Sequence, residues 1–283
     1  MTNTGKLFRM RRLSSANDGR HLFVPLDHSV SDGPVVPYDR WHDLLRNLVE
    51  GGADALIVHK GRARLVPPSI LASCALVVHL SAGTAHAADT NSKVLVGEAE
   101  DALRVGADAV SVHVNIGSDT EERQLADLGA VATACEAWGL PLIAMIYPRG
   151  PRIADPHDPA LLAHVVNIAA DLGADLVKTS VTLPVRRMAE VIANSPIPVL
   201  AAGGPVHRAD PTDGSDLIAY ATELMAAGCA GLAVGRKVFT SPNPASLVAR
   251  LAAVVHGQHA TVPDSPAHQA DLSRFPTMTT GAR

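Results

Sequence analysis

Lys178 stands within a run of strand-forming residues, Leu176-Val177-Lys178-Thr179-Ser180, rather than in a polar loop. Lysine is seldom buried without a chemical reason. Because side chains alternate across a strand, Leu176, Lys178 and Ser180 share one face. If that face looks into the protein, removal from water favours the neutral amine, which can attack a carbonyl carbon and form an imine. The alternatives are a lysine ion-paired with a core carboxylate and one whose amine reaches solvent at a rim.

Tyr147 and Asp27 each end an apolar run and supply groups that could move the protons of imine chemistry. Tyr147 follows Ile143-Ala144-Met145-Ile146, and Asp27 follows Leu22-Phe23-Val24-Pro25-Leu26. An imine gains and loses protons at oxygen and carbon, and a phenol or carboxylate in a partly dry pocket can transfer them. The alternatives are a hydroxyl bonded to a loop carbonyl and an aspartate that caps the next turn. We therefore predict Lys178, Tyr147 and Asp27 as the catalytic residues.

Two glycine-rich segments are candidates for phosphate binding. Ala202-Gly203-Gly204-Pro205 and Val234-Gly235-Arg236-Lys237 each follow an apolar run. Glycine exposes backbone N–H groups to an anion, and the loops after the last two strands of a (β/α)8 barrel form a recurring phosphate site. Arg236 can add a forked, charged grip. The glycines could instead serve simple turns. We predict phosphate binding by Gly203, Gly204, Gly235 and Arg236.

Four histidines also end apolar runs: His28, His59, His79 and His113. Such a group could hold a metal ion. However, no His-x-His pair follows the first run, and histidines equally serve as hydrogen-bonding groups around a substrate, the role we expect for His28. Lys60 is a rival amine, but its Lys60-Gly61 setting indicates an exposed loop, so we expect it to contact substrate. We predict no metal and no other cofactor.

The composition restricts the class of protein. The chain has 283 residues, 47% of them hydrophobic, and a net charge of −4, which suits one domain with a large core and argues against a nucleic-acid surface. Its three cysteines are far apart, so no disulfide framework follows. The arginine-rich N-terminus has no apolar segment of a secretory signal, and no apolar run reaches the roughly 20 residues that span a bilayer. We expect a cytoplasmic protein that binds neither nucleic acid nor membrane.

A repeat along the chain indicates how these residues are positioned. Gly-Ala-Asp stands at 52–54, 106–108 and 173–175, and Gly-Cys-Ala at 228–230; each precedes a short β-branched run. Each first glycine fits the position just after a helix, where the left-handed conformation favours glycine. The four runs that follow, at 55–59, 109–113, 176–178 and 232–234, have the length of strands.

Four further strands are predicted between these, over 22–27, 75–81, 141–147 and 198–204, with helices notably over 121–138, 160–172, 185–194, 215–227 and 245–256. Eight strands that alternate with helices favour a single (β/α)8 TIM barrel, whose active site lies at the carboxyl ends of the strands. An open doubly wound sheet is the alternative, but no G-x-G-x-x-G turn follows the first strand. We expect an N-terminal extension over 1–21 that covers the barrel floor, the barrel over 22–259 and an irregular tail over 260–283.

Several segments together resemble the archaeal-type class I aldolases of the DeoC and FbaB superfamily. The likeness covers nearly the whole barrel, and its segments include Asp27-His28-Ser29, His59-Lys60-Gly61, Lys93-Val94-Leu95, Ser111-Val112-His113, Tyr147-Pro148-Arg149-Gly150 and Val177-Lys178-Thr179. The resemblance implies that Lys178 forms the Schiff base, that Tyr147 and Asp27 handle protons, and that the glycine loops hold phosphate. One departure stands out: the family usually has Thr-Asn-Tyr-Thr-Gly after the lysine, whereas this chain has Thr179-Ser180-Val181-Thr182-Leu183.

The resemblance also implies an activity. Within the family, an actinobacterial branch is especially similar; it condenses dihydroxyacetone phosphate with L-aspartate 4-semialdehyde to a phosphorylated seven-carbon amino sugar acid used in secondary metabolism. Fructose-bisphosphate cleavage and hept-6-ulosonate synthesis are the alternatives within the family. We expect small-molecule phosphorylated ketone and aldehyde substrates and a homo-oligomer, a decamer being the size suggested. Outside the family, a metal-dependent barrel lyase or hydrolase and a sugar-phosphate binder without turnover remain alternatives.

Overall fold

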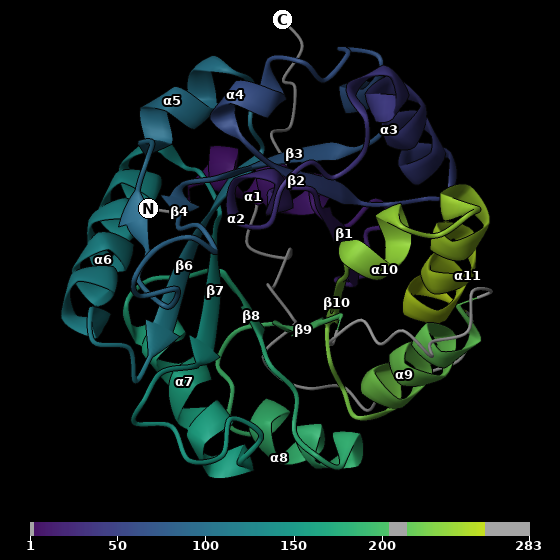
Figure 1. Cartoon of the computed structure of the whole chain (residues 1–283). Helices are drawn as coiled ribbons and strands as arrows, with labels where there is room; N and C mark the ends of the chain where they lie inside the picture. Colours follow the sequence, from purple (N-terminus) through teal and green to yellow (C-terminus); the bar gives the residue numbers. More distant parts are fainter. Residues whose placement is uncertain (1–2, 204–213, 258–283) are drawn as a thin grey trace, which may run out of the picture.

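Eight parallel strands close into a barrel in this computed structural model, which describes residues 3–203 and 214–257 (Figure 1). The strands neighbour one another in the order β1-β10-β9-β8-β7-β6-β3-β2. Their bounds are β1 (His21–Pro25), β2 (Ala55–His59), β3 (Ala75–His79), β6 (Ala109–Ile116), β7 (Leu142–Pro148), β8 (Leu176–Thr179), β9 (Val199–Ala202) and β10 (Gly231–Ala233). The predicted barrel is confirmed, and the open sheet is wrong.

Helices surround the barrel and connect its strands (Figure 1). The main ones are α3 (Trp41–Glu50), α5 (Ala99–Arg104), α6 (Glu121–Trp138), α7 (Pro159–Asp171), α8 (Met188–Ile192), α9 (Ser215–Ala226) and α11 (Pro244–His256). Shorter helical segments lie in the connections: α2 (His28–Ser31), η1 (Tyr38–Arg40), α4 (Lys60–Ala63), η2 (Ile70–Ala72), η3 (Val185–Arg187) and α10 (Arg236–Phe239). The five predicted helices are present, and the one expected over 185–194 is divided into η3 and α8.

The repeated glycines end helices, as their spacing predicted. Gly52, Gly106, Gly173 and Gly228 follow α3, α5, α7 and α9, with φ between 80° and 95°. A side chain is strained in this left-handed region, so glycine is favoured where the chain turns from helix into strand.

The aspartate of each Gly-Ala-Asp repeat fixes the start of the preceding strand. Asp54 accepts a hydrogen bond from the backbone N–H of Leu22 at 2.6 Å. Asp108 and Asp175 accept equivalent bonds from Leu76 at 2.9 Å and Leu142 at 2.8 Å. A carboxylate thus satisfies a backbone donor at the amino end of a strand, where no ladder partner is available. The repeat therefore builds the floor of the barrel.

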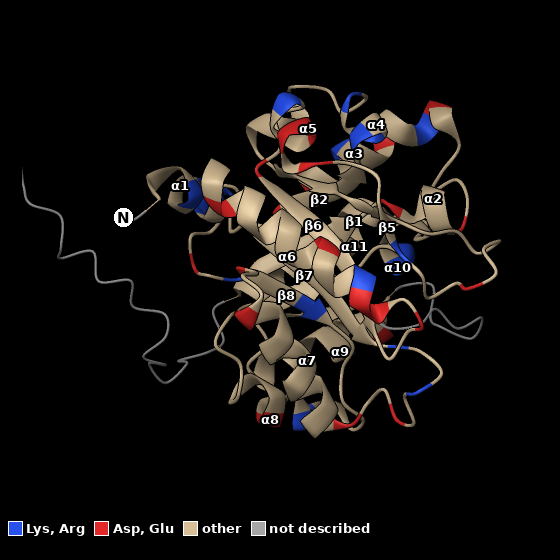
Figure 2. Ribbon diagram, turned by 90° about the vertical axis from the view of Figure 1, so that its left-hand side faces the viewer, with Lys and Arg blue, Asp and Glu red and all other residues tan. Residues whose placement is uncertain are grey.

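The segment before β1 lies against this floor. Helix α1 (Thr4–Arg12) sits at the end of the barrel opposite α2 and α10 (Figure 2). Its Lys6 lies 2.8 Å from Asp175 and its Arg12 2.5 Å from Asp108, so two of the repeat aspartates also pair with cations. Leu13, which follows the helix, is fully buried among the side chains of the barrel interior.

The mouth of the barrel is its opening at the carboxyl ends of the strands. The barrel interior is apolar up to the layer just below this mouth. Inward-facing residues of successive strands form one cluster that includes Phe23, Ile57, Val77, Ile143, Leu176 and Leu200. A second, larger cluster fills the space between the strands and the helices. Because the strands are buried on both faces, polar inward-facing residues near their carboxyl ends stand out as candidates for chemistry.

A short hairpin that the sequence analysis did not predict covers one side of the mouth. β4 (Ser81–Ala82) pairs antiparallel with β5 (Val94–Leu95), so the strand expected over 75–81 ends at His79 and the chain then leaves the barrel. The Ser81 hydroxyl accepts from the backbone N–H of His113 at 2.9 Å. The Asn115 side chain donates to the carbonyl of Asn91 at 2.8 Å. These bonds hold the hairpin against the end of β6.

The predicted tail over 260–283 and Gly204 lie outside the described residues. Within 3–203 and 214–257, we find no helix with the length and apolar character needed to cross a bilayer.

Candidate active site

Lys178 projects into the barrel from β8. Its neighbours in the strand register are Met145 on β7 and Leu200 on β9, both buried residues of the interior cluster. Leu176, two residues earlier on the same face, is fully buried. The half-buried amine therefore rises from an apolar layer. Within the described part of the chain it has neither an ion pair nor a hydrogen bond, so the alternative of a salt-bridged lysine is not what the structure shows.

Tyr147 lies beside the amine and is itself covered by an arginine. The Nζ of Lys178 is 5.9 Å from the centre of the Tyr147 ring, and the guanidinium carbon of Arg149 is 5.1 Å from it. Tyr147 is 6% exposed, which leaves the ring almost wholly in contact with protein. Cations near the face of an aromatic ring are attracted to it. Lys178 and Arg149 therefore both approach the same tyrosine ring.

Asp27 follows the carboxyl end of β1, and Lys178 is one of the charged groups that act on it. Its Oδ1 is 3.6 Å from Nδ1 of His28 and its Oδ2 is 3.8 Å from Nε2 of His79, distances too long for hydrogen bonds. Oδ1 is buried and has no hydrogen-bond partner in the described structure. Burial raises the pKa of Asp27. The combined lowering by His79, His28, Lys178 and His59 is larger, so the net shift of the pKa is downward. Asp27 is therefore an ionised carboxylate with an open acceptor site.

Three histidines and Tyr147 form a row of rings along β2, β3, β6 and β7. Successive centroids lie 5.3 Å apart for His59 and His79, 6.5 Å for His79 and His113, and 5.0 Å for His113 and Tyr147. Burial is the main cause that lowers the pKa of each histidine, to about 4 for His79. The three histidines are therefore uncharged at neutral pH.

One nitrogen of each of the three histidine rings forms a hydrogen bond within the protein. His59 donates from Nδ1 to the carbonyl of His79 at 3.1 Å. Nδ1 of His79 is 2.8 Å from the Ser111 hydroxyl, and Nε2 of His113 is 2.9 Å from the Asn115 side-chain oxygen. Across 3–203 and 214–257, no three histidine, cysteine or carboxylate side chains are grouped as metal ligands. The rings form a hydrogen-bonded wall of the mouth.

Two glycines make a corner without side chains where β9, β10 and β1 meet. A Cβ on Gly203 would lie 2.6 Å from the Val234 side chain and 3.0 Å from its Cα. A Cβ on Gly235 would lie 2.5 Å from the carbonyl oxygen of Pro25 and 2.7 Å from the His28 ring. Close packing therefore requires glycine at both positions. Gly203 is partly exposed and Gly235 is buried, so a side chain at either position would displace the neighbouring strand ends.

The structure places the other two predicted cations differently. Arg236 begins α10 beside the glycine corner, about half exposed, with Nη1 3.9 Å from Asp32. Lys60 begins α4 and lies 2.7 Å from Asp101 on α5. Arg236 is thus available to the mouth, whereas the Lys60 amine is held by the helix layer.

The departure after Lys178 forms an ordered turn. Val181 is buried, its carbonyl accepts from Nδ1 of His157 at 2.6 Å, and the Thr182 hydroxyl donates to the Pro184 carbonyl at 2.9 Å. Leu183 is largely exposed. The chain therefore has no aromatic side chain at this edge of the mouth, where the family pattern has tyrosine.

Sequence reasoning assigned no role to Lys93 or Arg149, although both lie in the segments that carry the family resemblance. Their spacing contained one signal: Arg149 follows Tyr147 at i+2, directly after the end of β7, and alternation along an extended segment would put both side chains on one face. The sequence contained no such signal for Lys93, because the β4–β5 hairpin that positions it was not predicted.

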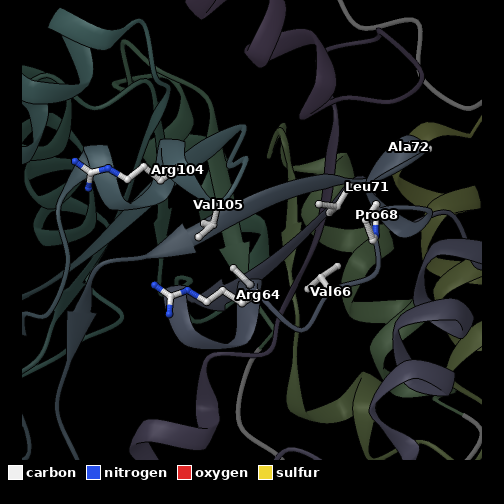
Figure 3. Close-up of a pocket in the computed structure, with 8 residues that line it drawn as sticks. Arg64, Val66, Pro68, Leu71, Ala72, Arg104 and Val105 are labelled. Carbon is white, nitrogen blue, oxygen red and sulfur yellow. The ribbon is translucent and has the colours of Figure 1, made fainter.

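A separate hollow lies in the outer layer, away from the mouth (Figure 3). Its lining comes from α4, η2 and the end of α5: Ala63, Arg64, Val66, Pro68, Leu71, Ala72, Arg104 and Val105. None of these residues belongs to a barrel strand. We therefore assign the chemistry to the mouth.

A closed parallel barrel and an inward lysine that is unpaired among the described residues and approaches a tyrosine ring are features of a class I aldolase. The profile of the DeoC/LacD family aldolases matches residues 21–241. The chain belongs to this aldolase family and is a lyase.

Curated relatives and solved structures agree with this class. The chain is 48% identical over 248 residues to 2-amino-4,5-dihydroxy-6-oxo-7-(phosphonooxy)heptanoate synthase of Streptomyces griseus, covering 88% of this chain and 89% of the relative. It is 37% identical to 2-amino-3,7-dideoxy-D-threo-hept-6-ulosonate synthase of Halobacterium salinarum, covering 90% and 93%. A Schiff-base-forming fructose-1,6-bisphosphate aldolase superimposes with a TM-score of 0.78 at 25% identity, covering 88% of this chain and 99% of that one.

Proposed function

We propose that the protein joins dihydroxyacetone phosphate to L-aspartate 4-semialdehyde and yields 2-amino-4,5-dihydroxy-6-oxo-7-(phosphonooxy)heptanoate. Three donor carbons and four acceptor carbons account for the seven-carbon chain. The observation that carries the proposal is the Lys178 amine, unpaired among the described residues, which rises from an apolar layer beside Tyr147. The choice of substrates is supported by the 48% identity to the Streptomyces griseus synthase.

The donor is activated first in this proposal. The neutral Lys178 amine attacks the ketone of dihydroxyacetone phosphate, and the carbinolamine loses water to form an iminium ion. The iminium withdraws electrons from the adjacent hydroxymethyl carbon, which then loses a proton and becomes the enamine carbon. Tyr147 and Asp27 transfer these protons in this account. The proposal is supported by the approach of the Lys178 amine to the Tyr147 ring and by the electrostatic influence of Lys178 on Asp27.

The donor phosphate is held at the glycine corner in this account. Gly203 and Gly235 bring backbone close to the mouth on β9 and β10, and Arg236 adds a positive charge beside them. Fixing the phosphate places the ketone over Lys178 and removes much of the entropic barrier of the first step. Gly204, which lies outside the described residues, would be a further phosphate contact in this account.

The acceptor then joins the enamine carbon. Its aldehyde carbon forms the new carbon–carbon bond, the aldehyde oxygen takes a proton, and water releases the product from Lys178. The departure from the family pattern at 180–183 bears on the acceptor rather than on the imine, because it lies beyond Lys178 at the edge of the mouth.

The proposal is tested by supplying dihydroxyacetone phosphate with separate aldehydes and identifying products by mass spectrometry. The panel is L-aspartate 4-semialdehyde, D-glyceraldehyde 3-phosphate and propanal. We expect the highest kcat/KM with L-aspartate 4-semialdehyde. Preference for glyceraldehyde 3-phosphate would instead assign fructose-bisphosphate aldolase activity, which the fold likeness makes the second candidate.

A further inference from the structure

Two cations lie on the side of the mouth across from the glycine corner. In the strand order, β6 and β7 are separated from β10 by β8 and β9 on one side and by β3, β2 and β1 on the other. Arg149 follows β7 and covers the Tyr147 ring at 5.1 Å. Lys93 immediately precedes β5, half-buried, and its Nζ donates to the carbonyl of Thr90 at 3.1 Å. A donor phosphate at Gly203 and Gly235 would leave both cations for another group.

The loop that carries Lys93 is fixed beside the strand end that carries Arg149. Asn115 and Gln124 both donate to the carbonyl of Asn91, at 2.8 Å and 3.1 Å. Asn115 is the register partner of Tyr147 in the β6–β7 pair. The anchored loop therefore brings Lys93 to the same edge of the mouth as Tyr147 and Arg149.

The charges at this edge are not neutralised in pairs. Within the described ranges, neither Lys93 nor Arg149 forms a salt bridge with a carboxylate. Burial lowers the pKa of Lys93 most, and Arg149 lowers it further, while Asp89 and Asp32 act in the opposite direction. Two cations in a partly dry site that have no carboxylate partner among the described residues favour an anion between them.

A carboxylate oxygen without a partner lies on the same loop. Oδ1 of Asp89 accepts from the backbone N–H of Asn91 at 2.8 Å. Oδ2 of Asp89 is buried and has no hydrogen-bond partner in the described structure. A buried acceptor left unsatisfied is costly, which indicates that a donor from outside the chain completes it. The edge therefore offers two cations and one open anion.

This pattern matches the two charges of an α-amino acid. We propose that Lys93 and Arg149 bind the α-carboxylate of the acceptor aldehyde and that Asp89 binds its α-ammonium group. The inference rests on the proposed function and adds the residues that select its second substrate. In L-aspartate 4-semialdehyde, the aldehyde and carboxylate carbons are separated by roughly 4 Å. Because Lys178 and Arg149 approach one tyrosine ring, such an acceptor can lie along Tyr147 between the enamine carbon and the guanidinium.

The test separates the acceptor step from the donor step. Exchange of the donor hydroxymethyl hydrogen with deuterated water reports enamine formation without any acceptor. Condensation kcat/KM is then measured with L-aspartate 4-semialdehyde and with succinate semialdehyde, which has the same carbon chain and carboxylate but no ammonium group. The variants are Lys93→Met, Arg149→Met and Asp89→Asn. Arg152→Met is the matched control, because Arg152 lies in the same loop as Arg149 but pairs with the exposed Asp119.

We expect Lys93→Met and Arg149→Met to lower kcat/KM for both aldehydes by about 10-fold to 100-fold, the range for lost charged hydrogen bonds. Asp89→Asn should lower it for L-aspartate 4-semialdehyde alone and so remove the preference over succinate semialdehyde. Donor exchange should stay within about 2-fold of wild type for Lys93→Met and Asp89→Asn, and Arg152→Met should change neither reaction.

Normal condensation by Lys93→Met and Asp89→Asn, with normal donor exchange, would overturn this inference and leave the proposed function intact. Wild-type protein that shows no donor exchange would remove the proposed function and this inference with it. If Arg149→Met also slows exchange through its contact with Tyr147, the Lys93→Met and Asp89→Asn variants decide, because within the described structure neither Lys93 nor Asp89 contacts the tyrosine ring.

Discussion

Lys178 and Tyr147 project from neighbouring strands with the amine nitrogen 5.9 Å from the centre of the ring. The β7–β8 register pairs Lys178 with Met145, so Tyr147 stands two residues nearer the mouth than the amine's direct neighbour. This stagger sets Tyr147 nearer to the carboxyl ends of the strands than Lys178, and in the proposed mechanism the tyrosine exchanges protons with the carbinolamine there. The stagger follows from the strand register.

Replacing Tyr147 by phenylalanine tests the proton-transfer role. Removal of one hydroxyl leaves the ring and its packing in place, so we expect normal folding and a kcat lower by about 10²-fold to 10⁴-fold, the range for a lost general acid or base. Steady-state kinetics measures kcat, and far-ultraviolet circular dichroism checks that the variant is folded. Tyr38→Phe is the matched control, since Tyr38 is 66% exposed. An unchanged kcat for Tyr147→Phe would remove the tyrosine from the mechanism.

Adding a methyl group at Gly203 tests the glycine corner. The new Cβ would lie 2.6 Å from the Val234 side chain and 3.0 Å from its Cα, so the ends of β9 and β10 must separate. We expect Gly203→Ala to lower the free energy of unfolding by about 1–3 kcal/mol and to raise KM for dihydroxyacetone phosphate at least about 10-fold by misplacing the phosphate contacts.

Gly129→Ala provides the control for that substitution. Gly129 lies within α6, and a Cβ there meets nothing within 4 Å. Alanine is favoured over glycine in a helix by about 1 kcal/mol, so this variant should be as stable as wild type or more so, with unchanged kinetics. Gly203→Ala with wild-type stability and KM, measured by urea unfolding and initial rates, would contradict the role of the corner.

His256, at the carboxyl end of α11, makes the free energy of unfolding fall as the pH becomes alkaline. His256 lies 2.9 Å from Asp18 and 3.0 Å from the buried Asp54. Burial alone lowers the pKa of His256, but hydrogen bonds and charges of Asp54 and Asp18 raise it overall to about 9. Since the folded pKa exceeds the unfolded value of 6.5, the stabilisation is complete below about pH 6.5 and is lost as pH rises through 9.

His256→Asn should therefore destabilise the protein at pH 6 by about 1–3 kcal/mol and by much less at pH 9.5. Urea unfolding of both proteins at the two pH values makes the comparison, with the exposed His42→Asn as control. The two aspartates have lowered pKa values, so their share of the interaction persists on the alkaline side and weakens only below about pH 4. Equal destabilisation at pH 6 and 9.5 would show that the His256 charge contributes nothing.

Treatment with a chelator separates imine chemistry from metal chemistry. An iminium ion supplies the electron sink in the proposed mechanism, so no divalent cation is required. After incubation with EDTA and gel filtration, we expect at least about 80% of the initial rate, because a metal-dependent barrel enzyme would lose most of its activity. Loss of activity that zinc or magnesium restores would favour the metal-dependent lyase instead.

Local patterns predicted the barrel and the face that Leu176 and Lys178 share, because both follow from short-range rules. The repeat glycines end helices through their own conformational freedom, and alternation along a strand placed Lys178 with Leu176 on one face. Contacts between distant segments could not be predicted in the same way. Ser111 is hydrogen-bonded to His79, 32 residues away in the sequence, and Asp101 accepts a hydrogen bond from Lys60, 41 residues away. Both bonds depend on how neighbouring strand ends and helices meet after the barrel has closed.

The most direct test of the central claim is covalent capture of the donor on Lys178. The protein is incubated with dihydroxyacetone phosphate, reduced with sodium borohydride, digested and analysed by mass spectrometry. We predict one reduced adduct, located on Lys178, and none in Lys178→Arg. An adduct on Lys60 instead, or no adduct while condensation proceeds at the normal rate, would contradict the account.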